Sequence, residues 1–74
     1  QLYMSKYPPS QRYYVVNKLG GVWNLYSAPD KKTAFKFKER VQKDMGKGYV
    51  KDIVRGQEQA FLIRDIARKE DKKK

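Results

Sequence analysis

The sequence predicts an α+β fold in which two β-hairpins flank one helix, in the order ββαββ. Three observations lead to this prediction. Paired glycines at 20 and 21 separate two segments of strand composition, a helix-start signal lies at Asp30, and two further strand-like segments follow residue 48. One antiparallel sheet with the single helix packed on one face accounts for all three.

The first hairpin is predicted to join residues 12–17 to residues 22–27. Both segments are rich in Tyr, Val and Trp, which are typical of strands. Gly20-Gly21 supplies the positive φ that a two-residue hairpin loop needs. Trp23 and Leu25 share one face of the returning strand, so we expect this face to point into the core.

The helix is expected between Asp30 and Gly48. The Asp30 carboxylate can cap the first turn, and Gly46 or Gly48 can adopt the left-handed conformation that ends a helix. Residues 33–40 also alternate as a strand would, so a strand stays the second interpretation of residues 31–39. The helical interpretation depends on apolar side chains at helical offsets, namely Ala34, Phe37, Val41 and Met45.

A second hairpin is predicted from residues 49–55 and 59–66, joined by a turn at residues 56–58. Alternation of apolar and polar side chains is blurred in the first segment, and in the second Phe61 and Ile63 face one way and Leu62, Arg64 and Ile66 the other. Packing the helix on this sheet gives a predicted core, with strand parities open by one residue: Val16, Trp23, Leu25, Ala34, Phe37, Val41, Met45, Val54, Phe61 and Ile63.

The predicted domain spans residues 11–67. Residues 1–10 are expected to form a flexible arm, because Pro8-Pro9 enforces an extended backbone without N–H donors. Residues 68–74 are too highly charged to be buried and are expected to form a disordered basic tail.

The composition limits the chemistry that this chain can perform. Its 74 residues include neither cysteine nor histidine, so thiolate and imidazole groups are both absent. An enzyme would have to depend on carboxylates, Lys, Tyr and Ser. Asp52, Glu58 and Asp65 are expected to pair with cations across strands instead. We therefore predict that the protein is not an enzyme and has no metal site and no cofactor.

The charge balance points to polyanionic partners. Lys and Arg number 18 against 8 Asp and Glu, a formal net charge of +10. Such a surplus favours DNA, RNA, an acidic protein or an anionic membrane surface, although excess lysine can also serve solubility alone. No apolar run approaches the roughly 20 residues that span a bilayer, and QLYMSKYPPSQ lacks the features of a signal peptide. We expect a cytoplasmic protein, associated with the nucleoid if it binds DNA.

Four segments carry a resemblance to a known family: YYVV, GGVWNLY, DKKTAFKFKERVQKDMG and VKDIVRGQEQAFLIRDI. Together they resemble a family of small uncharacterised bacterial domains with ββαββ order, in which a Gly-x-Trp hairpin precedes the helix. The resemblance covers most of residues 12–66, but this chain has few helix alanines and no Asp-Gly in its last turn. It implies the fold and no activity. A weaker resemblance, to the DNA-binding arm domains of tyrosine recombinases, implies a sheet laid into a DNA groove, although there the helix follows the sheet.

Two surfaces are predicted to bind nucleic acid. The sheet face opposite the helix would expose tyrosines among basic and amide side chains, which can stack on bases, neutralise phosphates and read base edges. Lysines on the helix can follow a phosphate backbone. The predicted contacts are Arg12, Tyr13, Asn24, Tyr26, Lys32, Lys36, Lys43, Lys47, Tyr49, Lys51 and Arg64.

The same observations leave a second function open. Tyr and Val are good strand formers, so the open sheet face or an edge strand can instead bind a protein partner or a second copy of the chain. Gly46-Lys47-Gly48 follows a helix and lacks the spacing of a phosphate-binding loop, so we interpret it as a helix cap. The primary prediction is a small basic module that contacts DNA or RNA; homodimerisation or protein binding is the alternative.

Overall fold

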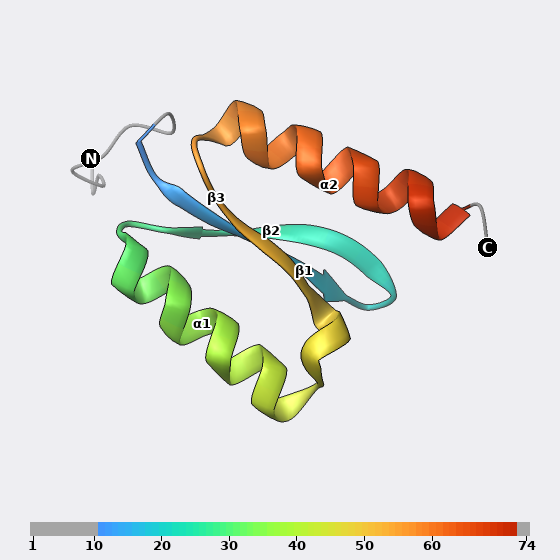
Figure 1. Ribbon diagram of the computed structural model, residues 1–74, viewed down its shortest axis with the longest axis horizontal. Helices are drawn as coiled ribbons and strands as arrows, with labels where there is room; N and C mark the ends of the chain where they lie inside the picture. The colour runs from blue at the N-terminus through green and yellow to red at the C-terminus, as the bar shows by residue number, and fades with distance from the viewer. Residues whose placement is uncertain (1–10, 73–74) are drawn as a thin grey trace.

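The chain forms one antiparallel sheet with a helix on each face, as a computed structural model of residues 11–72 shows (Figure 1). The elements are β1 (Tyr13–Leu19), β2 (Val22–Ala28), α1 (Lys31–Asp44), the 3-10 turn η1 (Lys47–Tyr49), β3 (Val50–Arg55) and α2 (Gln57–Lys72). The predicted α+β class is confirmed, but the order is ββαβα instead of ββαββ. The arm expected at residues 1–10 lies outside the described residues.

The first hairpin forms as predicted. Strands β1 and β2 pair antiparallel over their full length. The loop residues Gly20 and Gly21 have φ values of +62° and +81°. Positive φ at both positions matches the two-residue turn whose twist fits the flanking strands.

Strand β1 is the central strand, because β3 pairs with its other edge and gives the order β2-β1-β3. Strands β2 and β3 are each antiparallel to β1, so they run parallel to each other. Helix α1 is therefore the crossover that carries the chain from one edge of the sheet to the other. Four consecutive residues of β1, from Tyr14 to Asn17, are buried, which is the pattern of a strand covered on both faces.

Helix α1 forms where it was predicted, so the helical interpretation of residues 31–39 is correct. Asp30 caps it, with Oδ1 accepting the Thr33 N–H at 2.8 Å. The helix ends at Asp44, followed by Met45 as the C-cap and by Gly46 with a φ of +121°. Gly46 thus adopts the positive φ that was expected near this end, outside the region that L side chains favour.

Helix α1 covers the sheet face opposite to the one predicted. The buried cluster on this side contains Val15, Ala28 and Ala34, with Tyr26 and Phe37 packed against it. Residues 29 and 30 alone connect β2 to α1. This short connection places the helix over the face to which Ala28, the last residue of β2, already points.

The predicted fourth strand is wrong, because residues 57–72 form helix α2. Ala60 and Ala67 are buried on the side of α2 that faces the sheet. Ala67 belongs to a cluster with Val16 and Trp23, and Ile63 packs against that cluster. The Trp23 face is therefore a core face as expected, but α2 covers it and α1 does not.

The prediction of a disordered basic tail is wrong for residues 68–72, which belong to α2; residues 73–74 lie outside the described residues. Arg68 shows the reason, since its Nε donates to the Trp23 carbonyl at 3.0 Å. Contacts of this kind hold a highly charged segment against the sheet, which composition alone does not reveal.

The predicted core is largely confirmed. Val16, Trp23 and Ala34 are buried, and Leu25, Phe37, Val41, Val54 and Ile63 are half-buried. Met45 and Phe61 are exposed, because Met45 lies beyond the last turn of α1 and Phe61 lies off the stripe that α2 turns to the sheet. No helix within residues 11–72 is long and apolar enough to cross a bilayer.

Candidate nucleic-acid interface

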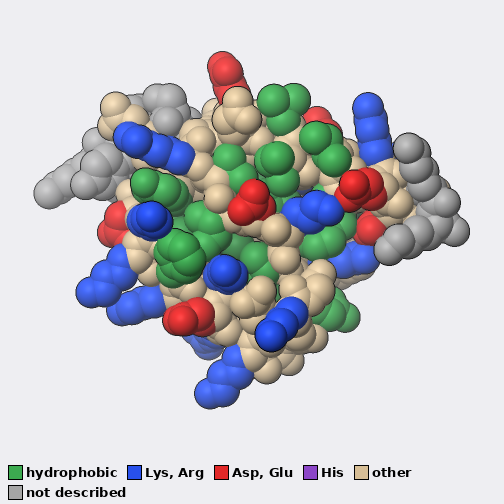
Figure 2. All heavy atoms as spheres, viewed as in Figure 1, with side chains coloured by type: hydrophobic (Ala, Val, Ile, Leu, Met, Phe, Trp, Pro, Cys, Tyr) green, Lys and Arg blue, Asp and Glu red, His purple; other side chains and the backbone are tan. Residues whose placement is uncertain are grey.

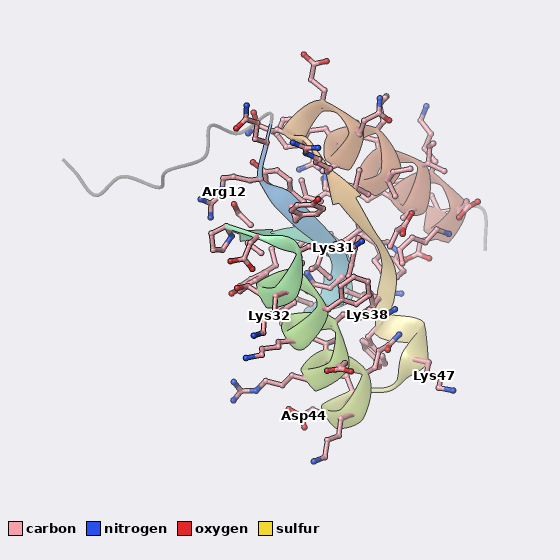
Figure 3. All side chains as sticks on the ribbon, turned by 60° about the vertical axis from the view of Figure 1, so that its left-hand side comes forward. Arg12, Lys31, Lys32, Lys38, Asp44 and Lys47 are labelled. Carbon is pink, nitrogen blue, oxygen red and sulfur yellow. The ribbon has the colours of Figure 1, made fainter. Side chains whose placement is uncertain are left out.

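Basic residues are distributed unevenly between the two helices. Helix α1 has six Lys or Arg and two acids, a net charge of +4, whereas α2 has four of each, a net charge of zero. The helices lie on opposite faces of the sheet, so the molecule has a basic side and a neutral side (Figure 1). Lys47 in η1 extends the basic side beyond the end of α1 (Figure 3).

The cations of α1 make no ion pair with any other residue in the range 11–72. The ion pairs found there are Lys18–Asp71, Lys51–Glu70 and Arg64–Asp65, and each uses an acid of α2. A cation without an ion pair can release its counterion and bind a phosphate, and no ion pair within the protein has to be broken.

Helix α1 presents its lysines on two flanks. Lys32, Lys36 and Lys43 are exposed, and their spacings of four and seven residues put them on one face, turned away from the sheet. Lys31 and Lys38, also seven residues apart, lie on the flank that faces β3 (Figure 3). The basic surface therefore extends from the outer face of α1 to its border with the sheet.

A groove of about 480 Å³ lies between α1 and β3. Lys31 and Lys38 from α1 and Arg55 from β3 line it, together with Phe35. Phe35 is 42% exposed. The Nζ atoms of Lys31 and Lys38 lie 5.9 and 5.4 Å from the centroid of its ring. Asp52 contributes an acid, and its Oδ1 accepts an N–H from the β3 backbone at 2.8 Å.

Cations and apolar side chains also mix on the face drawn in Figure 2. Lys and Arg side chains lie around the part of this face that α1 forms, and apolar side chains continue from there towards α2. A surface of this kind combines electrostatic attraction with area on which flat apolar groups can stack.

The prediction of an open sheet face with exposed tyrosines is wrong, because α1 covers that face. Tyr26 stacks on Phe37 with ring centroids 3.8 Å apart and an angle of 3° between the ring planes. Tyr13 packs against the cluster that contains Val15. Tyr49, in η1, is more exposed. The rings expected to stack on bases therefore mostly contribute to the packing of α1.

Four other residues predicted to contact nucleic acid form hydrogen bonds or ion pairs within the protein. Arg12 Nε donates to Ser27 Oγ at 2.6 Å. Asn24 Nδ2 donates to backbone carbonyls at the hairpin turn, at 3.0 and 3.4 Å. Lys51 and Arg64 pair with acids of α2. Of the eleven predicted residues, Lys32, Lys36 and Lys43 share the outer face of α1, and Lys47 lies beyond its end in η1.

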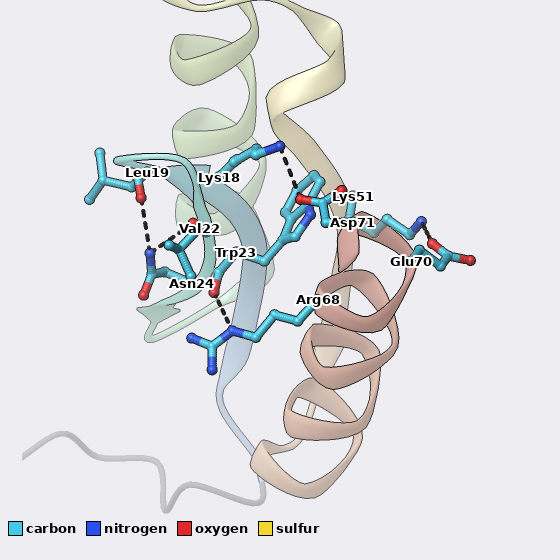
Figure 4. A network of polar contacts seen from close by, with 9 residues as sticks. All are labelled: Lys18, Leu19, Val22, Trp23, Asn24, Lys51, Arg68, Glu70 and Asp71. Atoms are coloured by element: carbon cyan, nitrogen blue, oxygen red, sulfur yellow. Dashed lines mark hydrogen bonds and ion pairs between the residues drawn. The ribbon is translucent and has the colours of Figure 1, made fainter. Parts of the chain in front are cut away.

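On the neutral side, cations attach α2 to the sheet (Figure 4). Lys18 Nζ lies 3.0 Å from an Asp71 carboxylate oxygen, and Lys51 Nζ lies 2.7 Å from one of Glu70. Arg68 adds its bond to the Trp23 carbonyl. These cations serve folding contacts, so the basic side is the better candidate for a polyanion.

Tyr13 and Lys51, which line the groove, were among the predicted contacts, but its other residues were not. Lys31, Phe35 and Lys38 lie four and three residues apart, which places them on one flank of a helix, and this signal was available in the sequence. Arg55 gave no such signal, because only the pairing of β3 with β1 brings it beside α1. No cluster of three or more metal-ligating side chains occurs within residues 11–72.

Fold and surface together define a small α+β domain with three strands, two helices and one basic side. No family model, curated protein or solved structure matches this chain. The resemblances noted in the sequence therefore stay predictions, and the function must be argued from the surface itself.

Proposed function

We propose that this protein is a nucleic-acid-binding module that contacts backbone phosphates of DNA or RNA through helix α1. The observation that carries the proposal is the charge asymmetry: α1 has a net charge of +4 and its cations lack ion pairs, whereas α2 is neutral. Each phosphate contact on duplex DNA releases about 0.9 counterion, so cations that carry no other contact contribute most.

The spacing of the outer lysines suits a phosphate backbone. Lys32 and Lys43 are eleven residues apart, which is about 16 Å along a helix at about 1.5 Å per residue. One strand of duplex DNA has a phosphate about every 3.4 Å along the axis, so this face spans several phosphates. The groups that best read base edges are engaged elsewhere, as with Asn24. We therefore expect the protein to bind nucleic acid through charge, with little preference for base sequence.

Charge reversal on α1 tests the proposal. We expect Lys36→Glu with Lys43→Glu to weaken binding at least tenfold and to lower the slope of log affinity against log salt by about 2. Fluorescence anisotropy with labelled duplex and single-stranded oligonucleotides, at about 50 and 200 mM salt, measures both quantities.

Lys69→Glu with Lys72→Glu is the matched control, since it makes the same change in charge on the neutral helix. We expect it to bind within about threefold of the wild type. Absence of binding at low salt, or an equal loss in both double variants, would contradict a site on α1.

Self-association through α2 is a second candidate function. Leu62 and Ile66 lie one turn apart on the outer side of α2 and are 55% and 49% exposed. Both sheet faces are covered by helices, so no open sheet face is available for self-association. A neutral helix with an exposed apolar pair is instead suited to pack against its own copy.

An antiparallel pairing of two α2 helices is self-complementary. With a two-fold axis between Leu62 and Ile66, each Leu62 faces the Ile66 of the second copy. The same axis sets each Glu58 at the level of Glu70 of the second copy, and Glu70 is already paired with Lys51 at 2.7 Å.

Sedimentation velocity over a range of protein concentrations tests the dimer. We expect Leu62→Glu with Ile66→Glu to abolish association, and Leu19→Glu with Val22→Glu, at the exposed hairpin end, to leave it unchanged. A wild-type chain that stays monomeric at every concentration would rule the dimer out, and the nucleic-acid proposal would be unaffected.

A further inference from the structure

We infer that the groove between α1 and β3 binds a segment of single-stranded nucleic acid, with one base stacked on Phe35 and neighbouring phosphates on Lys31 and Lys38. This inference rests on the proposed function and deepens it, because it names the strandedness of the ligand and a specific base contact. It replaces the covered tyrosines with an aromatic side chain that the structure leaves accessible.

The first step is the environment of Phe35. Phe35 is 42% exposed on a flank of the helix that is otherwise polar, so a ligand with a flat apolar face would gain by covering its ring. Lys31 and Lys38 lie four residues before it and three after it, with Nζ atoms 5.9 and 5.4 Å from the ring centroid. Two cations therefore lie within 6 Å of the ring centroid, one from the turn before Phe35 and one from the turn after it.

The second step is the match to a nucleotide. In a single strand every base has a phosphate on its 5′ side and another on its 3′ side, so a ring between two cations fits one base and its two phosphates. Base–aromatic stacking is stronger than a cation–π contact at an exposed site. The lysines can therefore leave the ring for the phosphates when a base arrives.

The third step is the opposite wall. Strand β3 is an edge strand, so its outer backbone groups have no strand partner. The Ile53 N–H already donates to Asp52 Oδ1, but other outer N–H groups can donate to a base edge and outer C=O groups can accept from one. Arg55 adds a cation on this wall, and Val50 and Ile53 add apolar area. The volume of about 480 Å³ lies within the range of small-ligand sites, roughly 300–1,000 Å³.

The fourth step is the distinction between single and double strands. Bases in a duplex are stacked on one another and paired, so Phe35 reaches a base only when it is unpaired. Lys32, Lys36 and Lys43 on the outer face contact phosphates of either form. The groove therefore adds affinity for single strands that the outer face alone does not supply.

Phe35→Ala is the test, with Phe61→Ala as the matched control. Phe61 on α2 is similarly exposed, at 40%, and also has a cation over its ring, with Arg64 Cζ 4.8 Å from the centroid. We expect Phe35→Ala to weaken binding of an oligothymidylate by about five- to a hundredfold. The same variant should change the affinity for duplex DNA less than twofold. Phe61→Ala should change neither the oligothymidylate affinity nor the duplex affinity.

An oligonucleotide of abasic sites isolates the stacking contribution, because it has the same phosphates and no bases. Wild type and Phe35→Ala should bind it equally, and Phe35→Trp should restore binding of the oligothymidylate. Circular dichroism of each variant confirms that the fold is retained.

The outcomes separate this inference from the proposed function. Equal losses for duplex and single strand, or equal wild-type affinity for the abasic and thymidylate oligonucleotides, would overturn the groove site and leave phosphate binding by α1 intact. Absence of binding to any oligonucleotide at low salt would overturn both. If polyglutamate binds more tightly than the oligothymidylate, and Phe35→Ala loses this binding, the groove would be assigned to an acidic peptide instead.

Discussion

Four alanine side chains set how closely the helices approach the sheet. Ala28, Ala34, Ala60 and Ala67 are at most 1% exposed. The first two belong to the cluster beneath α1, and Ala67 belongs to the cluster beneath α2. Interiors are close-packed, so added volume at such positions must displace a neighbour.

At Ala67, a larger side chain should destabilise the fold. We expect Ala67→Leu to lower the free energy of unfolding by about 1–3 kcal/mol, because leucine would push α2 away from Val16 and Trp23. Gln59→Leu, at an exposed position of the same helix, is the control and should change stability little. Urea unfolding followed by circular dichroism measures both variants, and equal stability of the two would argue against this packing.

Asp30 makes the N-terminal cap of α1 dependent on pH. Its pKa is lowered, chiefly by the hydrogen bond from the Thr33 backbone N–H and then by that from the Thr33 side chain. A lowered pKa means that the ionised cap stabilises the folded state. This stabilisation is complete above the ordinary pKa of 3.8 and is lost as the pH falls through the lower folded value.

Asp30→Ala should therefore lower the Tm at neutral pH, and the gap to wild type should close in acid. Asp44→Ala is the control, because an acid at the C-terminal end of a helix opposes the helix dipole and its loss should not destabilise. Thermal melts from pH 7 to pH 2 provide the measurement. A gap that persists unchanged in acid would show that the cap acts without its charge.

At the scale of elements, α2 is the part that sequence periodicity misassigned. Phe61, Leu62 and Ile63 form an apolar run that also fits a strand, and only Ile63 of the three is turned to the sheet. The helical stripe depends on Ala60 and Ala67, which are weak apolar signals. The choice of helix follows from the sheet, whose Trp23 face needs a cover that a fourth strand would not provide.

Proline substitutions distinguish a helix from a strand in this segment. We expect Asp65→Pro, in the interior of α2, to cost about 3 kcal/mol, a large share of the stability of a domain this small. Glu58→Pro lies in the first turn, where the N–H has no helical partner, and should be tolerated. Thermal unfolding compares them, and similar losses at both sites would count against a helix.

At the scale of the whole molecule, the separation of charge makes stability depend on salt. Lys32 and Lys36, and Lys36 and Arg40, are like-charge pairs four residues apart on α1, and such pairs destabilise a helix. The Debye screening length falls from about 30 Å at 0.01 M salt to about 3 Å at 1 M salt. We expect the Tm of the wild type to rise as salt increases over this range. The Tm of Lys36→Glu should rise less. A Tm that is independent of salt would contradict repulsion within α1.

The candidate site was predictable only in part, and the reason is physical. The outer lysines share a helix face at fixed spacings, so a correct helix prediction already groups Lys32, Lys36 and Lys43. The groove needs β3 beside α1, a contact between segments far apart in the chain that local patterns do not encode. The tyrosines were misplaced because their exposure depended on how many helices cover the sheet.

Local patterns in the sequence determined the first hairpin, the position of α1, the strand that follows it and the charge that α1 carries. Each of these depends on neighbours within a few residues: a glycine pair, a capping carboxylate, a period of apolar side chains. Only the tertiary structure decided that residues 57–72 are helical, which face each helix covers and which aromatic rings stay accessible. Those outcomes depend on burying both faces of the central strand, because the free energy of covering apolar surface is gained between segments that the sequence keeps apart.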